Sequence, residues 1–434
     1  MHNSGNSGIL GGRKSAQVCV RNERKKISTE LCLKWKTDAG NSNDLVRNNQ
    51  EKGDLMKFIH TSDLHLGKRL NEFSLIEDQR YILKRILDIV LAEKADGLII
   101  AGDIYDRQVP SAESVQLLDW FLTELAGYKV PVFAVSGNHD SAERIAFGSR
   151  LMNGRGIYLS PVYQGKTEKI VLQDSFGPVN LYLLPFIRPS VVRHALEEEN
   201  LEILSWQDAA EAAVSRMEIN PEERNLLVAH QFVTGASRCE SEEFMVGGID
   251  RVDGSVFSVF DYVALGHIHS PQHIGRETVR YCGTPLKYSF SEAEQKKSVT
   301  VVELQEKGMV RLRTIPLKPL HDLRKIRGTY LEVTVRSFYE GSNTDDYLQI
   351  TLTDEEDVPD GMQRLRVIYP NLMRLEYDNR RTRESRSVEQ VQEVEKRSGM
   401  ELFEEFYELQ NNQPMSEQQK KFARDLFREI QEKE

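Results

Sequence analysis

The stretch Phe58–Gly67, FIHTSDLHLG, decides how the rest of this 434-residue sequence is interpreted. Its apolar and β-branched residues predict a strand that ends near Ser62, and Asp63 and His65 follow at once. Alternate residues of an extended chain point the same way, and ligands of an α/β sheet bind just past the ends of its strands. The two side chains can therefore aim at one point. Because a D-x-H pair by itself is usually a solvated loop, a site here needs further ligands from elsewhere.

The composition is that of a globular protein with more than one domain, with 29% charged residues and a net charge of −10. No run approaches the roughly 18 apolar residues of a membrane span, and the N-terminus has no apolar secretory segment. The four cysteines are scattered without C-x-x-C spacing, which predicts neither a disulfide framework nor a structural zinc site. We therefore expect a cytoplasmic protein with no membrane partner.

Residues 1–55 differ from the rest of the chain. They are rich in Asn, Ser, Gly, Lys and Arg, show no sustained periodicity, and hold ten Lys or Arg against six Asp or Glu. This pattern favours disorder, and because Met56 directly precedes the first predicted strand, we expect an upstream extension that is not part of the natural protein. A basic nucleic-acid arm at 21–26 is the alternative. Since the remaining chain is acidic, DNA binding would depend on local basic patches and bound metal.

From residue 57 onward the pattern alternates between strands and helices. Strands are predicted at 57–62, 97–101, 130–135, 225–229 and 262–265, and helices at 74–93, 111–125 and from 141 onward. Pro110-Ser111 places a proline at the first turn of the second helix. Short, wholly apolar strands are typical of a parallel sheet that helices cover on its faces.

Each of the five predicted strands ends in Asp, Asn or His, often beside a glycine. The candidate metal ligands are Asp63, His65, Asp103, Asn138, His230, His267 and His269. Any one of them alone has an ordinary explanation as a turn former, a helix cap or a buried histidine, but their order and common position favour a single site. Gly102, Gly137 and Gly266 would let the backbone approach it closely. Carboxylate, amide and imidazole donors suit Mn²⁺, Fe or Zn²⁺, and seven residues suffice for two ions that share a carboxylate.

The motifs D-x-H, G-D-x-x-D, G-N-H-D and G-H-x-H, with a strand-end histidine between the last two, resemble the calcineurin-like metallophosphoesterase superfamily. The segments HTSDLHLG, AGDIYDR and GNHDS are similar to one branch of it, the bacterial nuclease subunits that work with an SMC-like ATPase. The resemblance runs from Met56 to the C-terminus. It implies an α/β fold, namely a four-layer αββα sandwich with a small α/β capping domain and a C-terminal helical segment.

The resemblance also implies a role for each matching residue. One Mn²⁺ would be held by Asp63, His65 and His269, and a second by Asn138, His230 and His267. Asp103 would bridge the two ions, for which Mg²⁺, Fe or Zn²⁺ are alternatives. His139 would be the catalytic histidine outside the metal shell, a role that suits a side chain that titrates near neutrality.

Asp106 is the one departure from the family pattern, because some relatives carry a second histidine in its place. An aspartate cannot be the same cationic donor at neutral pH. Its role in aligning the substrate is therefore open, and we expect it to accept a hydrogen bond or to pair with Arg107.

The region after the core predicts a small α/β capping domain. Alternating residues predict paired antiparallel strands within 298–316, and further elements follow as strands at 322–335, 347–353 and 372–377 with a helix at 361–368. Arg364, Arg366 and Arg374 would meet a DNA backbone or form a solvated face. The predicted segments are an extension at 1–55, a nuclease domain at 56–318, a capping domain at 319–379, a linker at 380–387 and a helical partner-binding segment at 388–434.

The last segment has two apolar stripes at helical spacing. The first comprises Leu402, Phe403, Phe406 and Tyr407, and the second Phe422, Leu426, Phe427 and Ile430, with a break at 411–414. Such a short helix pair folds back on the core or docks on a partner. The resemblance implies docking on the coiled coil of the SMC-like ATPase. It also implies a homodimer through the helices at 111–125 and 141–151, hence a heterotetramer, although core packing explains their apolar residues equally well.

The sequence thus predicts a metal-dependent DNA nuclease subunit. By resemblance it would act as a 3′-5′ double-strand exonuclease and single-strand endonuclease at DNA ends and hairpins, in repair, replication and recombination at the nucleoid. The motifs themselves leave the polarity of cleavage open. The alternatives are a two-metal phosphatase or cyclic-nucleotide phosphodiesterase, and a non-catalytic scaffold, which would require a broken metal shell.

Overall fold

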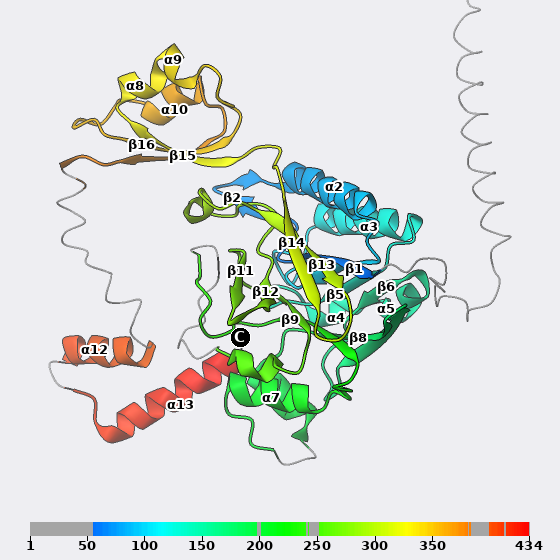
Figure 1. The fold of residues 1–434 in the computed structure, drawn as a ribbon. Helices are drawn as coiled ribbons and strands as arrows, with labels where there is room; N and C mark the ends of the chain where they lie inside the picture. Colours follow the sequence, from blue (N-terminus) through cyan, green and yellow to red (C-terminus); the bar gives the residue numbers. More distant parts are fainter. Residues whose placement is uncertain are drawn as a thin grey trace, which may run out of the picture. The chain divides into compact units, whose positions relative to one another are not determined.

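The computed structural model describes residues 55–197, 201–239, 242, 251–380, 382, 399–411 and 414–433 (Figure 1). The extension predicted for 1–55 lies outside the described residues except for Leu55. The same is true of most of the predicted linker, 380–387, and of the beginning of the predicted helical segment, 388–398. The domain boundaries named above therefore stay predictions.

The first of two six-stranded sheets contains the strand of the opening motif. Its order is β14-β13-β1-β4-β5-β6. The strands are β1 Met56–Thr61, β4 Gly97–Ala101, β5 Val132–Val135, β6 Ile157–Leu159, β13 Ser298–Leu304 and β14 Val310–Pro316. The strands β1, β4, β5 and β6 are parallel, while β13 and β14 are antiparallel, as expected for the pair within 298–316.

The second sheet has the order β11-β12-β10-β9-β8-β7. Its strands are β7 Glu168–Asp174, β8 Gly177–Leu184, β9 Arg224–His230, β10 Tyr262–Gly266, β11 Gln272–Ile274 and β12 Arg276–Tyr281. The neighbours β8, β9, β10 and β12 are parallel. All five strands predicted from the apolar runs are therefore present.

Helices cover the outer face of each sheet, which confirms the four-layer αββα sandwich. Phe58 and Ile99 pack between the sheets, whereas their neighbours Ile59, Leu98 and Ile100 pack beneath helices, as the alternation of a strand requires. The first sheet is covered by α2 Ile76–Ala92 and α3 Ala112–Gly127. The second is covered by α6 Pro189–Ala195 and α7 Trp206–Ser215.

Two helix predictions were wrong in detail. Pro110 lies outside the first turn of α3, because Ser111 is the N-cap and its side chain accepts a hydrogen bond from the Ser114 N–H. The helix expected from residue 141 is two short ones, α4 Ala142–Ile145 and α5 Ser149–Met152. Gly148 separates them with a left-handed φ of 73°, a conformation that a glycine adopts without strain.

The capping domain is a three-stranded parallel sheet with short helices. Its elements are β15 Leu323–Gly328, α8 Tyr330–Thr334, α9 Arg336–Tyr339, β16 Tyr347–Leu352, α10 Gly361–Arg366 and β17 Leu372–Tyr377. The strand predicted at 322–335 was too long, since Thr329 and Glu332 form a capping box that starts α8. Side-chain capping satisfies the first N–H groups of a helix and so ends the strand there.

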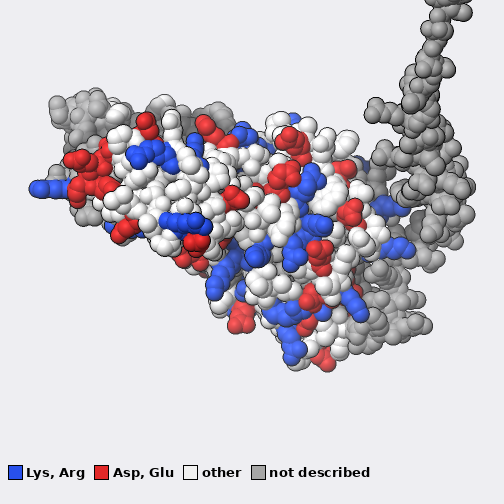
Figure 2. Space-filling view, turned by 90° about the horizontal axis from the view of Figure 1, so that it is seen from above, with Lys and Arg blue, Asp and Glu red and all other residues white. Residues whose placement is uncertain are grey.

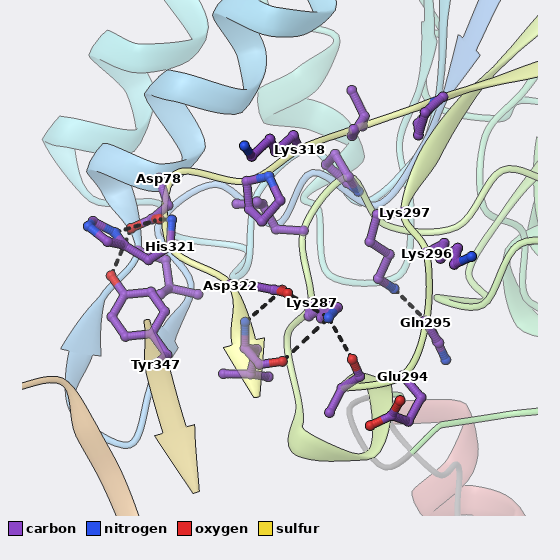
Figure 3. Close-up of a pocket in the computed structure, with 18 residues that line it drawn as sticks. Asp78, Lys287, Glu294, Gln295, Lys296, Lys297, Lys318, His321, Asp322 and Tyr347 are labelled. Atoms are coloured by element: carbon purple, nitrogen blue, oxygen red, sulfur yellow. Dashed lines mark hydrogen bonds and ion pairs between the residues drawn. The ribbon is translucent and has the colours of Figure 1, made fainter. Parts of the chain in front are cut away.

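Asp78, a buried residue of α2, forms hydrogen bonds with His321, which precedes β15, and with Tyr347 of β16 (Figure 3). The Tyr347 hydroxyl donates to Asp78 Oδ2 at 2.7 Å. His321 Nδ1 lies 3.0 Å from Asp78 Oδ1, and the His321 N–H donates to the same oxygen at 3.2 Å. These bonds lie beside a cavity of about 400 Å³ lined by residues of 285–297 and 316–323.

Replacing Tyr347 with phenylalanine should lower the free energy of unfolding by about 2 kcal/mol, because the buried Asp78 carboxylate loses a charged hydrogen bond. Urea unfolding of the full chain measures the change. Tyr128→Phe is the matched control, since the Tyr128 side chain is exposed. Equal unfolding midpoints for the two variants would contradict the prediction.

The C-terminal residues form two helices, α12 Gly399–Asn411 and α13 Glu417–Lys433, as predicted. Their aromatic stripes meet, with the rings of Phe403 and Phe427 5.7 Å apart. An ion pair of 2.9 Å joins Lys420 to Glu404. The Phe422 side chain is nevertheless 71% exposed and that of Phe406 58%, so the pair leaves part of its apolar surface uncovered. None of the helices in the described ranges is long and apolar enough to cross a membrane.

Candidate metal centre

The loops that follow five strands bring the eight predicted site residues together. Asp63 and His65 follow β1, Asp103 follows β4, and Asn138 and His139 follow β5. His230 is the last residue of β9, while His267 and His269 follow β10. Because the strands β1, β4 and β5 are parallel, and β9 and β10 likewise, each set ends at one edge of its sheet. The two sets meet where Asp103 Oδ2 lies 3.3 Å from His230 Nε2.

Four residues of the site have a positive φ, a backbone conformation that residues other than glycine rarely adopt. The φ angles are 52° at Asp63, 43° at His65, 45° at Asp103 and 98° at His267. Two hydrogen bonds hold the loops in register, from the Asp63 N–H to Gly102 O at 3.0 Å and from the His65 N–H to Asp103 O at 2.9 Å. Positive φ at four residues costs of order 1–3 kcal/mol each and clusters at functional sites.

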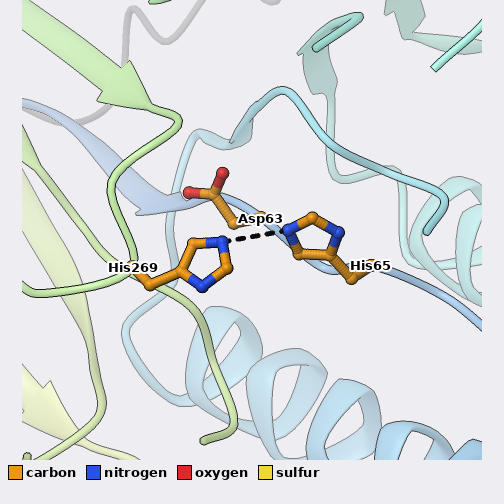
Figure 4. A group of neighbouring side chains, drawn as sticks. All are labelled: Asp63, His65 and His269. Atoms are coloured by element: carbon orange, nitrogen blue, oxygen red, sulfur yellow. Dashed lines mark hydrogen bonds between the residues drawn. The ribbon is translucent and has the colours of Figure 1, made fainter. Parts of the chain in front are cut away.

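Asp63, His65 and His269 form one compact group of metal-binding side chains (Figure 4). His65 Nε2 and His269 Nε2 lie 3.1 Å apart. Burial lowers the pKa of His65 well below its ordinary value, so its imidazole is neutral and offers a lone pair, as a metal ligand must. Asp63 Oδ2 is buried and has no hydrogen-bond partner among the described residues. A cation between these atoms would satisfy that oxygen and both nitrogens, so the group fits a metal ion.

Asn138, His230 and His267 form the second group. Asn138 Oδ1 lies 3.0 Å from His230 Nε2 and 2.9 Å from His267 Nδ1. Burial lowers the pKa of His267 well below its ordinary value. One amide oxygen and two imidazoles that converge in this way are a ligand set for Mn²⁺, Fe or Zn²⁺.

The Asp103 carboxylate lies between the two groups. Its Oδ2 is 3.3 Å from His230 Nε2 and 3.6 Å from His65 Nε2. Burial alone would raise the pKa of Asp103, but the positive charge on His230 holds it well below the ordinary value. For His230, burial is outweighed by Asp103, which raises the pKa to about 9, so an ion that binds here would have to displace a proton from this ring. An ionised carboxylate between two ligand groups is the arrangement that a bridging ligand requires.

His139 lies beside the first group and is only partly buried. Its ring centroid is 4.8 Å from that of His65. The His139 N–H donates to Asp103 Oδ1 at 2.9 Å. Its Nδ1 lies 3.1 Å from the Asp106 carbonyl oxygen, and because a carbonyl only accepts, Nδ1 carries a proton. This hydrogen bond fixes the orientation of the ring and leaves Nε2 as the nitrogen that can bind a second proton.

Asp106 pairs chiefly with a residue that was not anticipated. Its Oδ1 lies 2.8 Å from Lys68 Nζ, and its Oδ2 lies 3.8 Å from Arg107 Nε, so the expected pair with Arg107 is present but longer. Asp106, His65 and His139 also lie close enough together to share an ion. The structure therefore places Asp106 at the site through Lys68 and its own backbone carbonyl.

Asp140 is a site residue whose role the sequence did not reveal. Its buried carboxylate accepts hydrogen bonds from the N–H groups of Ile104 at 3.0 Å, Tyr105 at 2.8 Å and Gly137 at 2.9 Å. Burial and the nearby Asp103 raise its pKa to about 6. Asp140 thus ties the loop after β4 to the loop after β5. The last letter of the G-N-H-D motif was the available signal.

Gly137 is needed at this junction because the two loops approach so closely. A Cβ atom at this position would lie 2.1 Å from Asp103 Oδ1, far inside van der Waals contact. The glycine therefore serves close approach, as expected from its place in the motif.

A buried ion pair behind His269 was also missed. Glu292 Oε1 lies 3.7 Å from His269 Nδ1, and Glu292 Oε2 lies 2.5 Å from Lys297 Nζ. Lys297 Nζ also donates to His269 O at 2.9 Å and to Thr284 Oγ1 at 2.7 Å. These contacts hold both the ring and the backbone of His269. They could not be predicted from the sequence motifs, because Glu292 and Lys297 lie beyond the last one.

Replacing Lys297 with methionine should lower the free energy of unfolding by about 3 kcal/mol, because it leaves the buried Glu292 carboxylate without its partner. Thermal or urea unfolding of the full chain measures this. Lys318→Met is the matched control, since Lys318 is exposed on the same cavity. A loss no greater than that of the control would show that the pair contributes nothing to stability.

Two family models match the chain. Residues 56–271 match the model described as calcineurin-like phosphoesterase, a range that contains all eight predicted site residues. Residues 319–411 match the model described as type 5 capsule protein repressor C-terminal domain.

The chain is also similar to individual proteins. SbcD, the nuclease subunit of SbcCD, from Staphylococcus epidermidis is 32% identical over 386 residues, which cover 87% of this chain and 100% of that protein. Among solved structures, TT1561 of Thermus thermophilus is 12% identical and a dimetal phosphatase from Danio rerio 14%. Each of these alignments covers 61% of this chain and 100% of the other, with a TM-score of 0.35. Similarity at this level carries no argument, so the relationship rests on the family model and the curated relative.

Proposed function

Because the chain belongs to the calcineurin-like phosphoesterases and, within them, to the SbcD nucleases, we propose that it hydrolyses DNA phosphodiester bonds at a two-metal centre. The observation that carries the proposal is the convergence of seven ligand-type side chains and His139 at the ends of five strands. The substrates would be DNA ends and hairpins in repair, replication and recombination. We place this activity in the cytoplasm, at the nucleoid.

The ligands divide between the two ions as their distances suggest. Asp63, His65 and His269 would hold one ion and Asn138, His230 and His267 the other. Asp103 would bridge them, since its Oδ2 lies within 3.6 Å of nitrogens from both groups. We take Mn²⁺ as the native ion, with Mg²⁺, Fe or Zn²⁺ as alternatives, because the mixed oxygen and nitrogen donors suit these ions.

When bound, two such ions supply a strongly nucleophilic oxygen from water at neutral pH and stabilise charge on the phosphate. The protein residues supply orientation and proton transfer. His139, fixed through Nδ1 by the Asp106 carbonyl at 3.1 Å, presents Nε2 as the proton donor to the scissile phosphate or the leaving oxygen. Asp140 keeps the loops of Asp103 and His139 at a constant separation through its three N–H contacts.

DNA binding would depend on local contacts, because the charge of the protein gives no favourable overall field. The net charge is −10, and Figure 2 shows Lys and Arg intermixed with Asp and Glu over the face in view. The Arg374 guanidinium pairs with Glu376 at 2.7 Å, and Arg366 bonds to the Leu372 carbonyl at 3.0 Å. Two of the three arginines named from the sequence of the cap are thus already engaged.

A partner would cover the α12–α13 helix pair. Its apolar groove is lined by Phe403, Tyr407, Met415, Phe422, Ala423 and Leu426, among others. We propose that an SbcC-like SMC ATPase docks its coiled coil there. Phe422→Ser should abolish co-purification of the two proteins while DNA-hairpin cleavage by the isolated chain persists. Retained co-purification would contradict docking of the ATPase at this groove.

A homodimer, and with the ATPase a heterotetramer, is the assembly we propose. Phe147, between α4 and α5, is 83% exposed and Leu151, on α5, is 84% exposed. Exposed apolar side chains of this size on adjacent turns favour an interface between copies. Light scattering of the full chain, with Leu151→Glu as the disrupting variant, tests the assembly.

The proposed reaction is tested by offering the manganese-loaded full chain two substrates. It should cleave a DNA hairpin. If every DNA substrate stayed intact while a small phosphomonoester was turned over, the two-metal phosphatase would replace the nuclease as the function of this site.

A further inference from the structure

Two arginines lie over phenylalanine rings beside the metal centre. Arg238 Cζ is 3.6 Å from the centroid of the Phe232 ring, and Arg188 Cζ is 5.8 Å from the centroid of the Phe186 ring. The pairs belong to different loops, since 186–188 follows β8 and 232–238 follows β9. Neither arginine belongs to one of the metallophosphoesterase motifs of the sequence.

Both phenylalanines contact His267, one of the proposed ligands. The ring of Phe186 stacks on His267 at a centroid distance of 6.4 Å and an angle of 20°. The ring of Phe232 lies 6.2 Å from the same imidazole.

The loops that hold these pairs are anchored to neighbouring segments. The Phe186 N–H donates to Ser136 O at 2.8 Å, next to the G-N-H-D loop. On the other loop, Ser237 and Gln272 exchange two hydrogen bonds of 2.9 Å. The two arginines therefore start from fixed loops, which lowers the entropy lost when a ligand binds.

The chemistry of a guanidinium that lies over an aromatic ring points to a phosphate ligand. The ring attracts the cation, and the planar fork of guanidinium N–H donors matches the oxygens of a phosphate. We propose that Arg188 and Arg238 bind the backbone phosphates of the DNA strand next to its scissile phosphodiester. The proposal rests on the proposed nuclease function, and it supplies the local positive charge that a chain of net charge −10 requires.

A purely structural role is the competing explanation, in which the arginines only keep the two rings against His267. The two roles differ in what they predict for a substrate without flanking phosphates. A phosphate-binding role affects DNA and spares a small diester, whereas a supporting role affects both alike.

The test measures kcat/KM of the full chain with Mn²⁺ for a DNA hairpin and for bis(4-nitrophenyl) phosphate. Arg188→Ala and Arg238→Ala should each reduce kcat/KM for DNA about tenfold more than for the small diester, because each removes a charged hydrogen bond made only by DNA. Each variant should also make the slope of log binding constant against log salt shallower by about 1. Arg85→Ala is the control, since Arg85 pairs with Asp88 on α2.

Two results would overturn the assignment. An equal loss on both substrates would make the arginines supports of the metal centre, and an unchanged salt slope with unchanged DNA cleavage would remove them from substrate binding. Failure of the nuclease function is recognisable separately, because then the unmodified chain cleaves no DNA and the phosphate assignment falls with it.

Discussion

Replacement of His139 with alanine is expected to lower kcat on a DNA hairpin by about 10³-fold, the range that a general acid contributes. The ring bonds to the Asp106 carbonyl through Nδ1 and so presents Nε2 to the substrate. Its backbone N–H, which bonds to Asp103 at 2.9 Å, is kept by the alanine variant. The proposed bridging carboxylate therefore keeps that contact, and metal should stay bound.

The measurement pairs steady-state cleavage with metal content of the same sample by mass spectrometry. His194→Ala is the matched control, because the His194 side chain is 89% exposed and lies outside the site. A variant that loses metal together with activity would contradict the assignment of His139 to proton transfer and make it a ligand, as its place beside His65 and Asp106 also allows.

Replacement of Asp103 with alanine is expected to remove metal and activity together. The Oδ2 atom of its carboxylate lies within 3.6 Å of nitrogens from both ligand groups. Loss of the stabilisation by metal is worth several kcal/mol, so the rate should fall by about 10³-fold or more, given about 1.4 kcal/mol for each factor of ten. Metal analysis should find less than half of the normal content.

Asp119→Asn serves as control, because Asp119 is an exposed carboxylate on α3. Unfolding measurements on metal-free protein separate the loss of ligand from a loss of fold, since His230 also loses its charged partner in the variant. Full metal content with full activity in Asp103→Ala would exclude the bridge.

The positions of the candidate ligands could be predicted from the sequence because strand ends are easily recognised. An apolar run followed by Asp, Asn or His fixes where the side chain lies, at the carboxyl edge of a parallel sheet. For that reason Asp63, His230 and His267 lie at strand ends, as predicted, although they are far apart along the chain, and their role as ligands stays a prediction. The alternation of Phe58 and Ile59 between two layers follows from the same periodicity.

The residues that support the ligands could not be predicted in the same way. Glu292 lies 3.7 Å from His269 Nδ1 and 2.5 Å from Lys297 Nζ. Both contacts depend on how the chain after β12 returns to the site. Asp140 matters through three N–H groups from two loops. Such contacts have no period in the sequence. In contrast, Thr329 and Glu332 formed a readable capping box, so the overlong strand at 322–335 was avoidable.

The proposed function depends on a dinuclear metal centre that Asp103 bridges and at which DNA is hydrolysed. Electron paramagnetic resonance during Mn²⁺ titration of the metal-free full chain tests it most directly, with hairpin cleavage followed in parallel. We expect an exchange-coupled dinuclear signal that completes at two equivalents, coincides with full cleavage and is absent in Asp103→Ala. Full cleavage at one equivalent, or two uncoupled Mn²⁺ signals in the active chain, would contradict it.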